Sequence, residues 1–167
     1  MPQVVDAANL SLVPLDLPNL RRLAASEPAS LQALAGALPP AYVAASALSQ
    51  LRSGTSPNWC VPFLIVATGS GDILGGCRFK GEPVDGRVEI GYGVAEAARG
   101  RGVATSAVSR LLGLAASSGR VHQVDAHILP DNIASSKVVS RLGFSRGGLI
   151  VDPDGELVVH WAYRIAT

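Results

Sequence analysis

Arginine and glycine alternate at the start of residues 99–105, which read Arg-Gly-Arg-Gly-Val-Ala-Thr. Glycine lets the backbone turn tightly and approach a ligand without a clash from Cβ. An amphipathic helix is predicted to begin here, and a helix start offers unpaired N–H groups and about half a positive charge. Together with the arginine charges, these groups predict a site for a phosphate or pyrophosphate. The candidate binding residues are Arg99, Gly100, Arg101, Gly102, Val103, Ala104 and Thr105.

Glu89 precedes two glycines in the predicted strand 87–94. Because side chains alternate between the two faces of a sheet, Glu89, Gly91 and Gly93 are expected on one face. A glycine inside a strand often marks the close approach of another group to the backbone. The two glycines therefore predict an open track along the sheet, in which a slender ligand could lie beside the carboxylate.

Asn132 and Ser135 stand at the start of another predicted helix, with the spacing Asn-x-x-Ser. Both residue types are favoured as helix caps. Capping is a sufficient explanation for the pair, and it is compatible with contact to a ligand at the same helix end.

The spacing of the glycines excludes two other phosphate-binding motifs. A dinucleotide site requires Gly-x-Gly-x-x-Gly after a strand and an acidic residue at the end of the next strand. Residues 100–105 lack the third glycine, and the next predicted strand ends with Ile128 and Leu129. The Gly-Lys-Ser/Thr of a Walker loop is absent. The chain also has no Cys-x-x-Cys and no histidines four residues apart, so we predict no metal site.

These candidate residues are positioned by an alternation of predicted strands and helices. The predicted strands span residues 9–14, 60–68, 73–80, 87–94, 122–129, 144–151 and 157–165. A first predicted helix begins after Asp16, and the others span residues 29–38, 41–52, 102–118 and 132–143. The order predicts an α/β fold with flanking helices around a mixed, mostly antiparallel sheet that contains one parallel crossover.

The composition predicts one folded domain over residues 1–167, because 48% of the residues are apolar and 16% are charged. A net charge of +1 argues against a general nucleic-acid-binding protein. No apolar run approaches the ~20 residues that span a bilayer. The N-terminus also lacks a basic segment followed by an apolar one, so we expect no secretory signal. Cys60 and Cys77 are expected to be free thiols in a reducing compartment. We therefore expect a cytoplasmic protein with no nucleic-acid or membrane partner.

Four segments together resemble the GNAT superfamily of N-acetyltransferases, most closely its ribosomal-protein N-terminal acetyltransferase branch. They are residues 89–94, 99–105, 129–136 and 141–144, within a resemblance that covers residues 9–165. The family pattern Gln/Arg-x-x-Gly-x-Gly/Ala is met by Arg99, Gly102 and Ala104. The resemblance implies the acyl-CoA N-acyltransferase (GNAT) fold, with acetyl-coenzyme A (acetyl-CoA) as the co-substrate and its pyrophosphate on residues 99–105.

The resemblance also implies roles for individual residues. The backbone near Gly93 and Val94 would bind the pantetheine arm where this strand splays from the next, and Asn132 would contact the same region. Ser135 is the candidate for protonating the departing thiolate, since Val139 occupies the position of a tyrosine in many members.

The implied activity is direct acetyl transfer from acetyl-CoA to a primary amine of a small molecule or a protein N-terminus. Glu89 is the predicted general base, directly or through a water, because the attacking amine must be neutral. A glutamate that only orients the amine is the alternative. A non-catalytic acyl-CoA sensor on the same fold is the alternative function, and the protein is expected to be a monomer or a homodimer.

Three further residues could contribute to a site but are interpreted as packing residues. His127 shares a strand face with Asp125, but no nucleophile completes a triad with them. His160 and Trp161 lie on the last predicted strand, where an acceptor cleft could form; packing is favoured for both because aromatic side chains mostly serve burial.

Overall fold

The computed structural model describes residues 9–166, in which seven strands form one sheet in the order β1-β2-β3-β4-β5-β7-β6. The strands are β1 (Leu10–Pro14), β2 (Phe63–Ala67), β3 (Ile73–Phe79), β4 (Arg87–Val94), β5 (Gln123–Ile128), β6 (Ser145–Val151) and β7 (Leu157–Arg164). Every neighbouring pair is antiparallel except β4 and β5. The predicted mixed α/β sheet with one parallel crossover is therefore confirmed.

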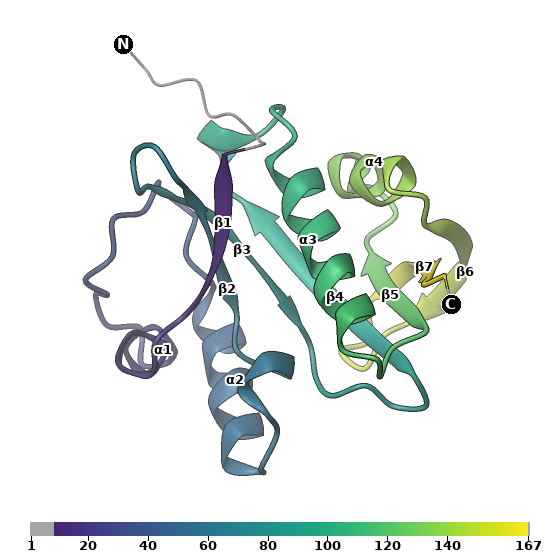
Figure 1. Ribbon diagram of the computed structural model, residues 1–167, viewed down its shortest axis with the longest axis horizontal. Coiled ribbons are helices and arrows are strands. Elements are labelled where there is room, and N and C mark those ends of the chain that lie inside the picture. The colour runs from purple at the N-terminus through teal and green to yellow at the C-terminus, as the bar shows by residue number, and fades with distance from the viewer. Residues whose placement is uncertain (1–8, 167) are drawn as a thin grey trace.

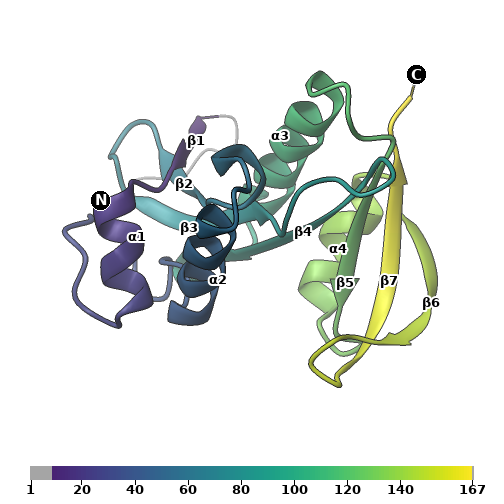
Figure 2. The same ribbon diagram turned by 90° about the horizontal axis from the view of Figure 1, so that it is seen from below.

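Helices cover both faces of the sheet (Figures 1 and 2). They are α1 (Leu17–Ala24), α2 (Ala41–Arg52), α3 (Val103–Ser117) and α4 (Ile133–Arg141). Two hydrophobic cores result, one between the sheet and α3 with α4, the other between β2 and α1 with α2. Within residues 9–166, no helix has the length and apolar character that a bilayer span requires.

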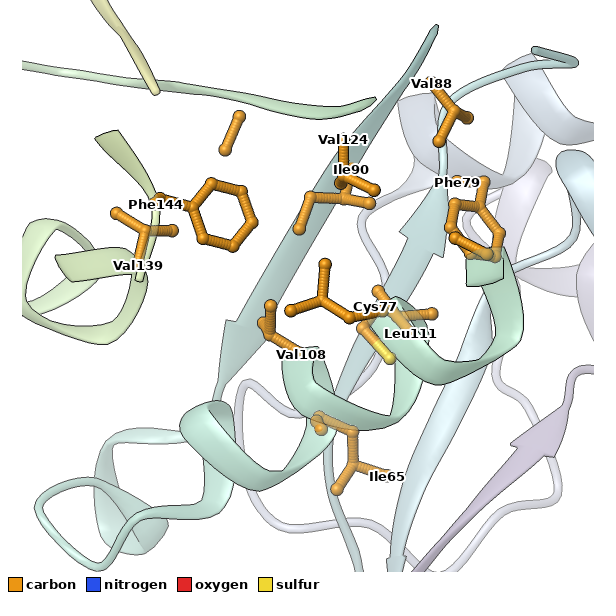
Figure 3. Close-up of a cluster of buried hydrophobic side chains, with 14 of the residues drawn as sticks. Ile65, Cys77, Phe79, Val88, Ile90, Val108, Leu111, Val124, Val139 and Phe144 are labelled. Carbon is orange, nitrogen blue, oxygen red and sulfur yellow. The ribbon is translucent and has the colours of Figure 1, made fainter. Parts of the chain in front are cut away.

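The core between α3 and the sheet determines where residues 99–105 lie. Val108 and Leu111 of α3 are fully buried and face Ile90 of β4 and Cys77 of β3 (Figure 3). These side chains recur at helical spacing on α3, which is why the sequence predicts this helix well. Because this face is packed, the N-terminus of α3 is held at the end of β4.

Strands β4 and β5 pair over only part of their length. Their parallel register runs from Arg87 opposite Gln123 to Ile90 opposite Ala126. Strand β4 nevertheless continues to Val94. The two strands therefore separate beyond Ile90, as the family resemblance implies, and backbone groups of β4 lose a partner strand on that side.

The helix predicted for residues 29–38 is wrong. Ala33 forms an isolated parallel bridge with Ile73, and two hydrogen bonds join this segment to β3: Leu34 N to Ile73 O at 3.0 Å and Ile73 N to Gln32 O at 2.9 Å. Leu34 also packs against both cores. Tertiary pairing has outweighed the helical propensity of alanine and leucine, which is worth only tenths of a kcal/mol per residue.

Candidate active site

A cavity of about 520 Å³ occupies the place where β4 and β5 separate. Strand β4 contributes residues 90–94, and β5 with the following loop contributes residues 126–129. Asn132 and Ser135 at the start of α4 line the cavity, as do residues 36–40 before α2. The cavity therefore brings together segments that the sequence analysis singled out separately.

The N-terminus of α3 has the geometry expected of an anion site. Gly100 and Gly102 have φ angles of +76° and +77°, a backbone conformation that residues with a Cβ rarely adopt. Gly102 is the N-cap and supplies no side-chain hydrogen bond. The first helical bond found here runs from Ser106 N to Gly102 O at 3.0 Å.

The amides of the next three residues remain available at this helix end. In the described part of the chain, the N–H groups of Val103, Ala104 and Thr105 have no hydrogen-bond acceptor. Helix α4 differs, because Asn132 Oδ1 accepts from Ser135 N at 3.1 Å and caps that helix. The segment 99–105 thus fits a pyrophosphate group, with amides and a helix dipole directed at it.

Arg99 connects this helix end to the cavity. Its Nε donates to Val94 O at 3.1 Å, and the residue lines the cavity. Arg101 is exposed. One arginine of the pair is therefore held over the end of β4, and the other extends from the surface.

The register of β4 decides which of its backbone groups face the opening. Lys80 N donates to Glu89 O at 2.9 Å, so Glu89 points its backbone at β3. In an antiparallel ladder this direction repeats every two residues, so Gly93, opposite Gly76, also points at β3. The backbone groups of Tyr92 and Val94 point the other way, toward the gap. The backbone of Val94 therefore faces the gap, as the family resemblance implies. The backbone of Gly93 faces β3 instead, but the absence of a side chain at Gly93 leaves space beside the strand.

The open track is confirmed at Gly93 and partly filled at Gly91. A Cβ added at Gly93 would meet no atom within 4 Å. One added at Gly91 would lie 3.1 Å from Lys80 Cε and 3.5 Å from Arg78 Nε. The side chains of Arg78 in β3 and of Lys80, just after that strand, therefore cross the track at Gly91 and leave it open at Gly93.

Glu89 is bound by two basic side chains. Its Oε1 accepts from Lys80 Nζ at 3.1 Å and from His127 Nδ1 at 2.7 Å. His127 and Lys80 line the cavity, whereas Glu89 is not among the lining residues. The role of Glu89 as general base stays a prediction, and the structure places an imidazole between its carboxylate and the cavity.

The sequence analysis missed His127 as a site residue. Glu89 lies opposite Asp125 in the parallel register, and His127, two residues further along β5, lies on the same face of the sheet. Only the register shows this, because the two residues are 38 positions apart in the chain. From the sequence, the contact could have been suggested only by assuming that the two predicted strands pair and then comparing the positions of Glu89 and His127 within them.

Tyr92 of β4, a second group that the sequence did not single out, contacts the start of α4. Tyr92 OH donates to Ser135 O at 3.0 Å, and both residues line the cavity. Burial raises the pKa of Tyr92 to about 12, although its hydrogen bond with Ser135 acts in the opposite direction. The phenol therefore stays neutral near pH 7 and positions this end of the cavity rather than acting as a strong acid. Val139 is fully buried in the core.

Asp125 forms a buried network beside Glu89. Its carboxylate accepts from His160 Nε2 at 2.7 Å, from Gln123 Nε2 at 2.8 Å and from Arg87 at 3.2 and 3.3 Å. Burial alone would raise the pKa of Asp125, but these hydrogen bonds and the charge of Arg87 hold it below its usual value. The network joins side chains of β4, β5 and β7.

We expect Asp125→Asn to lower the free energy of unfolding at pH 7 by about 1–3 kcal/mol, because hydrogen bonds to a charged group are lost. A carboxyl with a lowered folded-state pKa contributes stability above its unfolded-state pKa and loses it as the pH falls through the folded value. The difference from the unmodified protein should therefore shrink below about pH 4. Urea unfolding between pH 7 and pH 3 measures it. Asp154→Asn, in the turn between β6 and β7, is the control, and an equal difference at every pH would contradict the assignment.

Comparisons with known proteins support the same interpretation of the fold. The family model described as "Acetyltransferase (GNAT) domain" matches residues 9–145. The uncharacterized N-acetyltransferase p20 of Bacillus licheniformis is 31% identical over 91 residues, which cover 54% of this chain and 51% of that protein. The uncharacterized N-acetyltransferase YjdG of Bacillus subtilis (strain 168) is 30% identical over 102 residues, which cover 60% and 58%. The chain thus spans between half and three-fifths of the length of these two curated relatives.

Two solved structures share the fold at low sequence identity. The ribosomal L7/L12 alpha-N-protein acetyltransferase RimL superposes with a TM-score of 0.67 at 20% identity, covering 97% of this chain and 96% of that one. The aminoglycoside acetyltransferase AAC(6')-Ib in complex with coenzyme A also gives 0.67, at 19% identity, covering 93% and 94%.

Proposed function

The chain belongs to the GNAT acetyltransferase family, and from this we propose that it transfers an acetyl group from acetyl-CoA directly to a primary amine. The observation that carries the proposal is the uncapped N-terminus of α3 beside the cavity between β4 and β5. An anion site at the entrance of a narrow opening suits a ligand with a pyrophosphate and a slender arm.

Each part of the donor site has a named set of residues in this proposal. The amides of Val103, Ala104 and Thr105 hold the pyrophosphate, together with Arg101. The backbone groups of Tyr92 and Val94 that face the gap bind the pantetheine arm. Asn132 and Ser135 close the same opening from the start of α4.

Acetyl-CoA supplies a thioester whose acetyl carbon forms a bond to the amine nitrogen as the carbon–sulfur bond breaks. In this proposal, the ammonium form of the acceptor gives one proton to His127 before attack, and a second proton passes from the nitrogen to solvent water as the amide forms. An ionised carboxylate only accepts hydrogen bonds, so His127 Nδ1 is the donor to Glu89, and in the neutral ring Nε2 carries the lone pair. Glu89 is then a positioning residue that fixes the tautomer of His127.

The thiolate that departs needs no strong acid. A thiol has an ordinary pKa near 8.5, so its anion is a tolerable leaving group. The thiolate then takes a proton from the solvent or from the hydroxyl of Ser135. A covalent enzyme intermediate is not favoured, because the buried Cys77 has its pKa raised to about 12 by burial. An amine can instead attack the thioester directly.

A screen of primary amines tests the proposed function. We expect thiol release from acetyl-CoA, measured together with the gain of one acetyl group on the amine by mass spectrometry. Pools of amino acids, peptides, polyamines and aminoglycosides serve as acceptors. Binding of coenzyme A without thiol release for any pool would contradict the proposal and favour the acyl-CoA sensor.

A further inference from the structure

The charged residues that line the cavity are all basic. They are Arg78, Lys80 and Arg99, and none of the lining residues is an aspartate or a glutamate. Arg99 belongs to the α3 end, where the donor site is proposed. Arg78 and Lys80 lie on the β3 side and cross the track at Gly91. The part of the cavity that remains for an acceptor is therefore bordered by two cations.

Arg78 differs from the other arginines in residues 9–166. It alone is half-buried, while the others are exposed. Its guanidinium has no hydrogen bond or ion pair with any described residue, whereas Arg87 binds Asp125 and Lys80 binds Glu89. Partial burial without a partner disfavours the charged form, and desolvation accordingly lowers the pKa of Arg78, although Tyr42 and Glu89 act in the opposite direction. Such a group is stabilised when an anion binds to it.

The position of Arg78 relative to Glu89 limits the size of the ligand. Arg78 lies opposite Gly91 in the register of β3 and β4. Gly91 is two residues from Glu89 on the same face of the strand, a separation of about 7 Å. Arg78 and His127 also line the same cavity, so an amine next to His127 and an anionic group on Arg78 can belong to one small molecule or to one terminal residue.

We propose that Arg78 binds a carboxylate of the acceptor, so that the substrate is an amine carrying a carboxylate group close to its nitrogen. This inference rests on the proposed acetyl transfer and names its acceptor class. A free amino acid and a peptide that begins with an acidic residue both present this chemistry. Polycationic amines fit poorly, because the cavity lining offers no carboxylate to balance their charge.

Pairs of acceptors that differ only in the carboxylate test the inference. One arm compares amino acids with their α-carboxamides. The other compares C-terminally amidated peptides that begin with aspartate or with asparagine, and so distinguishes the two sources. We expect the unmodified protein to prefer the carboxylate by about 10- to 100-fold in kcat/KM in one arm, as one hydrogen-bonded charge pair allows.

Three variants assign the preference to Arg78. In Arg78→Gln we expect the preference to fall to about threefold or less, and Arg78→Lys should keep part of it, since lysine retains the charge without the planar fork. Arg110→Gln makes the same change on an exposed part of α3, on the opposite face of the sheet, and should keep the full preference. Equal use of both members of each pair, or an Arg78→Gln variant that keeps the preference, would overturn the inference.

Calorimetry on the coenzyme A-bound protein separates this inference from the proposed function. The same acceptor pairs are titrated without any requirement for turnover. Carboxylate-selective binding that depends on Arg78, found without thiol release, would support the anion site and contradict the enzyme. Thiol release from carboxamides as fast as from carboxylates would support the enzyme and contradict the anion site.

Discussion

Gly102→Asp is expected to weaken coenzyme A binding by about 100-fold or more, because two charge-assisted hydrogen bonds are lost that contribute about 1.5–3 kcal/mol each. Gly102 is the N-cap of α3 at φ +77°. Aspartate is a favoured N-cap residue, so its carboxylate would accept from the amides of the first turn and occupy the site itself. Its charge would also repel a pyrophosphate. Isothermal titration with coenzyme A measures the effect.

A matched substitution at the other end of the same helix controls for backbone strain. Gly119 has φ +68°, is exposed, and a Cβ added there would meet nothing within 4 Å. Gly119→Asp therefore introduces the same side chain in the same backbone conformation, at a distance from the cavity. We expect it to cost some stability and to leave coenzyme A affinity unchanged. Equal affinities for the Gly102 and Gly119 variants would remove residues 99–105 from the donor site.

His127→Gln is expected to lower kcat/KM by about 100-fold or more, which is the usual contribution of a general base. Glutamine keeps a polar group near Glu89 but cannot accept a proton at neutral pH. Coenzyme A affinity should stay the same, because His127 Nδ1 is bonded to Glu89 and lies on the face of the sheet opposite α3. Steady-state thiol release with an acceptor found in the screen measures the effect.

The size of this effect relative to Glu89→Gln distinguishes two mechanisms. If Glu89 positions His127, Glu89→Gln should cost about tenfold, by analogy with the carboxylates that orient metal-bound histidines, whose loss costs about 10- to 100-fold. If Glu89 is itself the base, its variant should be the more damaging of the two. His122→Gln is the matched control, since this exposed ring lies outside the cavity, where it bonds to the carbonyl of Asp85 and packs against Gly86. A His127 variant as active as the His122 variant would exclude His127 as the base.

Much of the fold could be predicted from short stretches of sequence. Residues 102–118 show an apolar stripe at helical spacing, and α3 occupies Val103–Ser117. The strands and the single parallel crossover also follow, because hydrophobic periodicity and turn residues act over a few positions. The helix expected for residues 29–38 does not form. The bridge of this segment to Ile73 joins parts of the chain that are distant in sequence, so local patterns could not predict it.

The candidate site likewise combines features that short stretches of sequence predict with features that only the folded structure determines. The glycines at 100 and 102, the helix that follows them and the capping Asn132 are local features, because backbone conformation and free amides depend on near neighbours. The sequence alone therefore predicts where an anion would bind. The contact of Glu89 with His127 requires the register of β4 and β5, and the missing partner of Arg78 depends on every side chain around it. Because these relations exist only between packed elements, the proton acceptor and the charge of the acceptor cleft could be inferred only once the chain was folded.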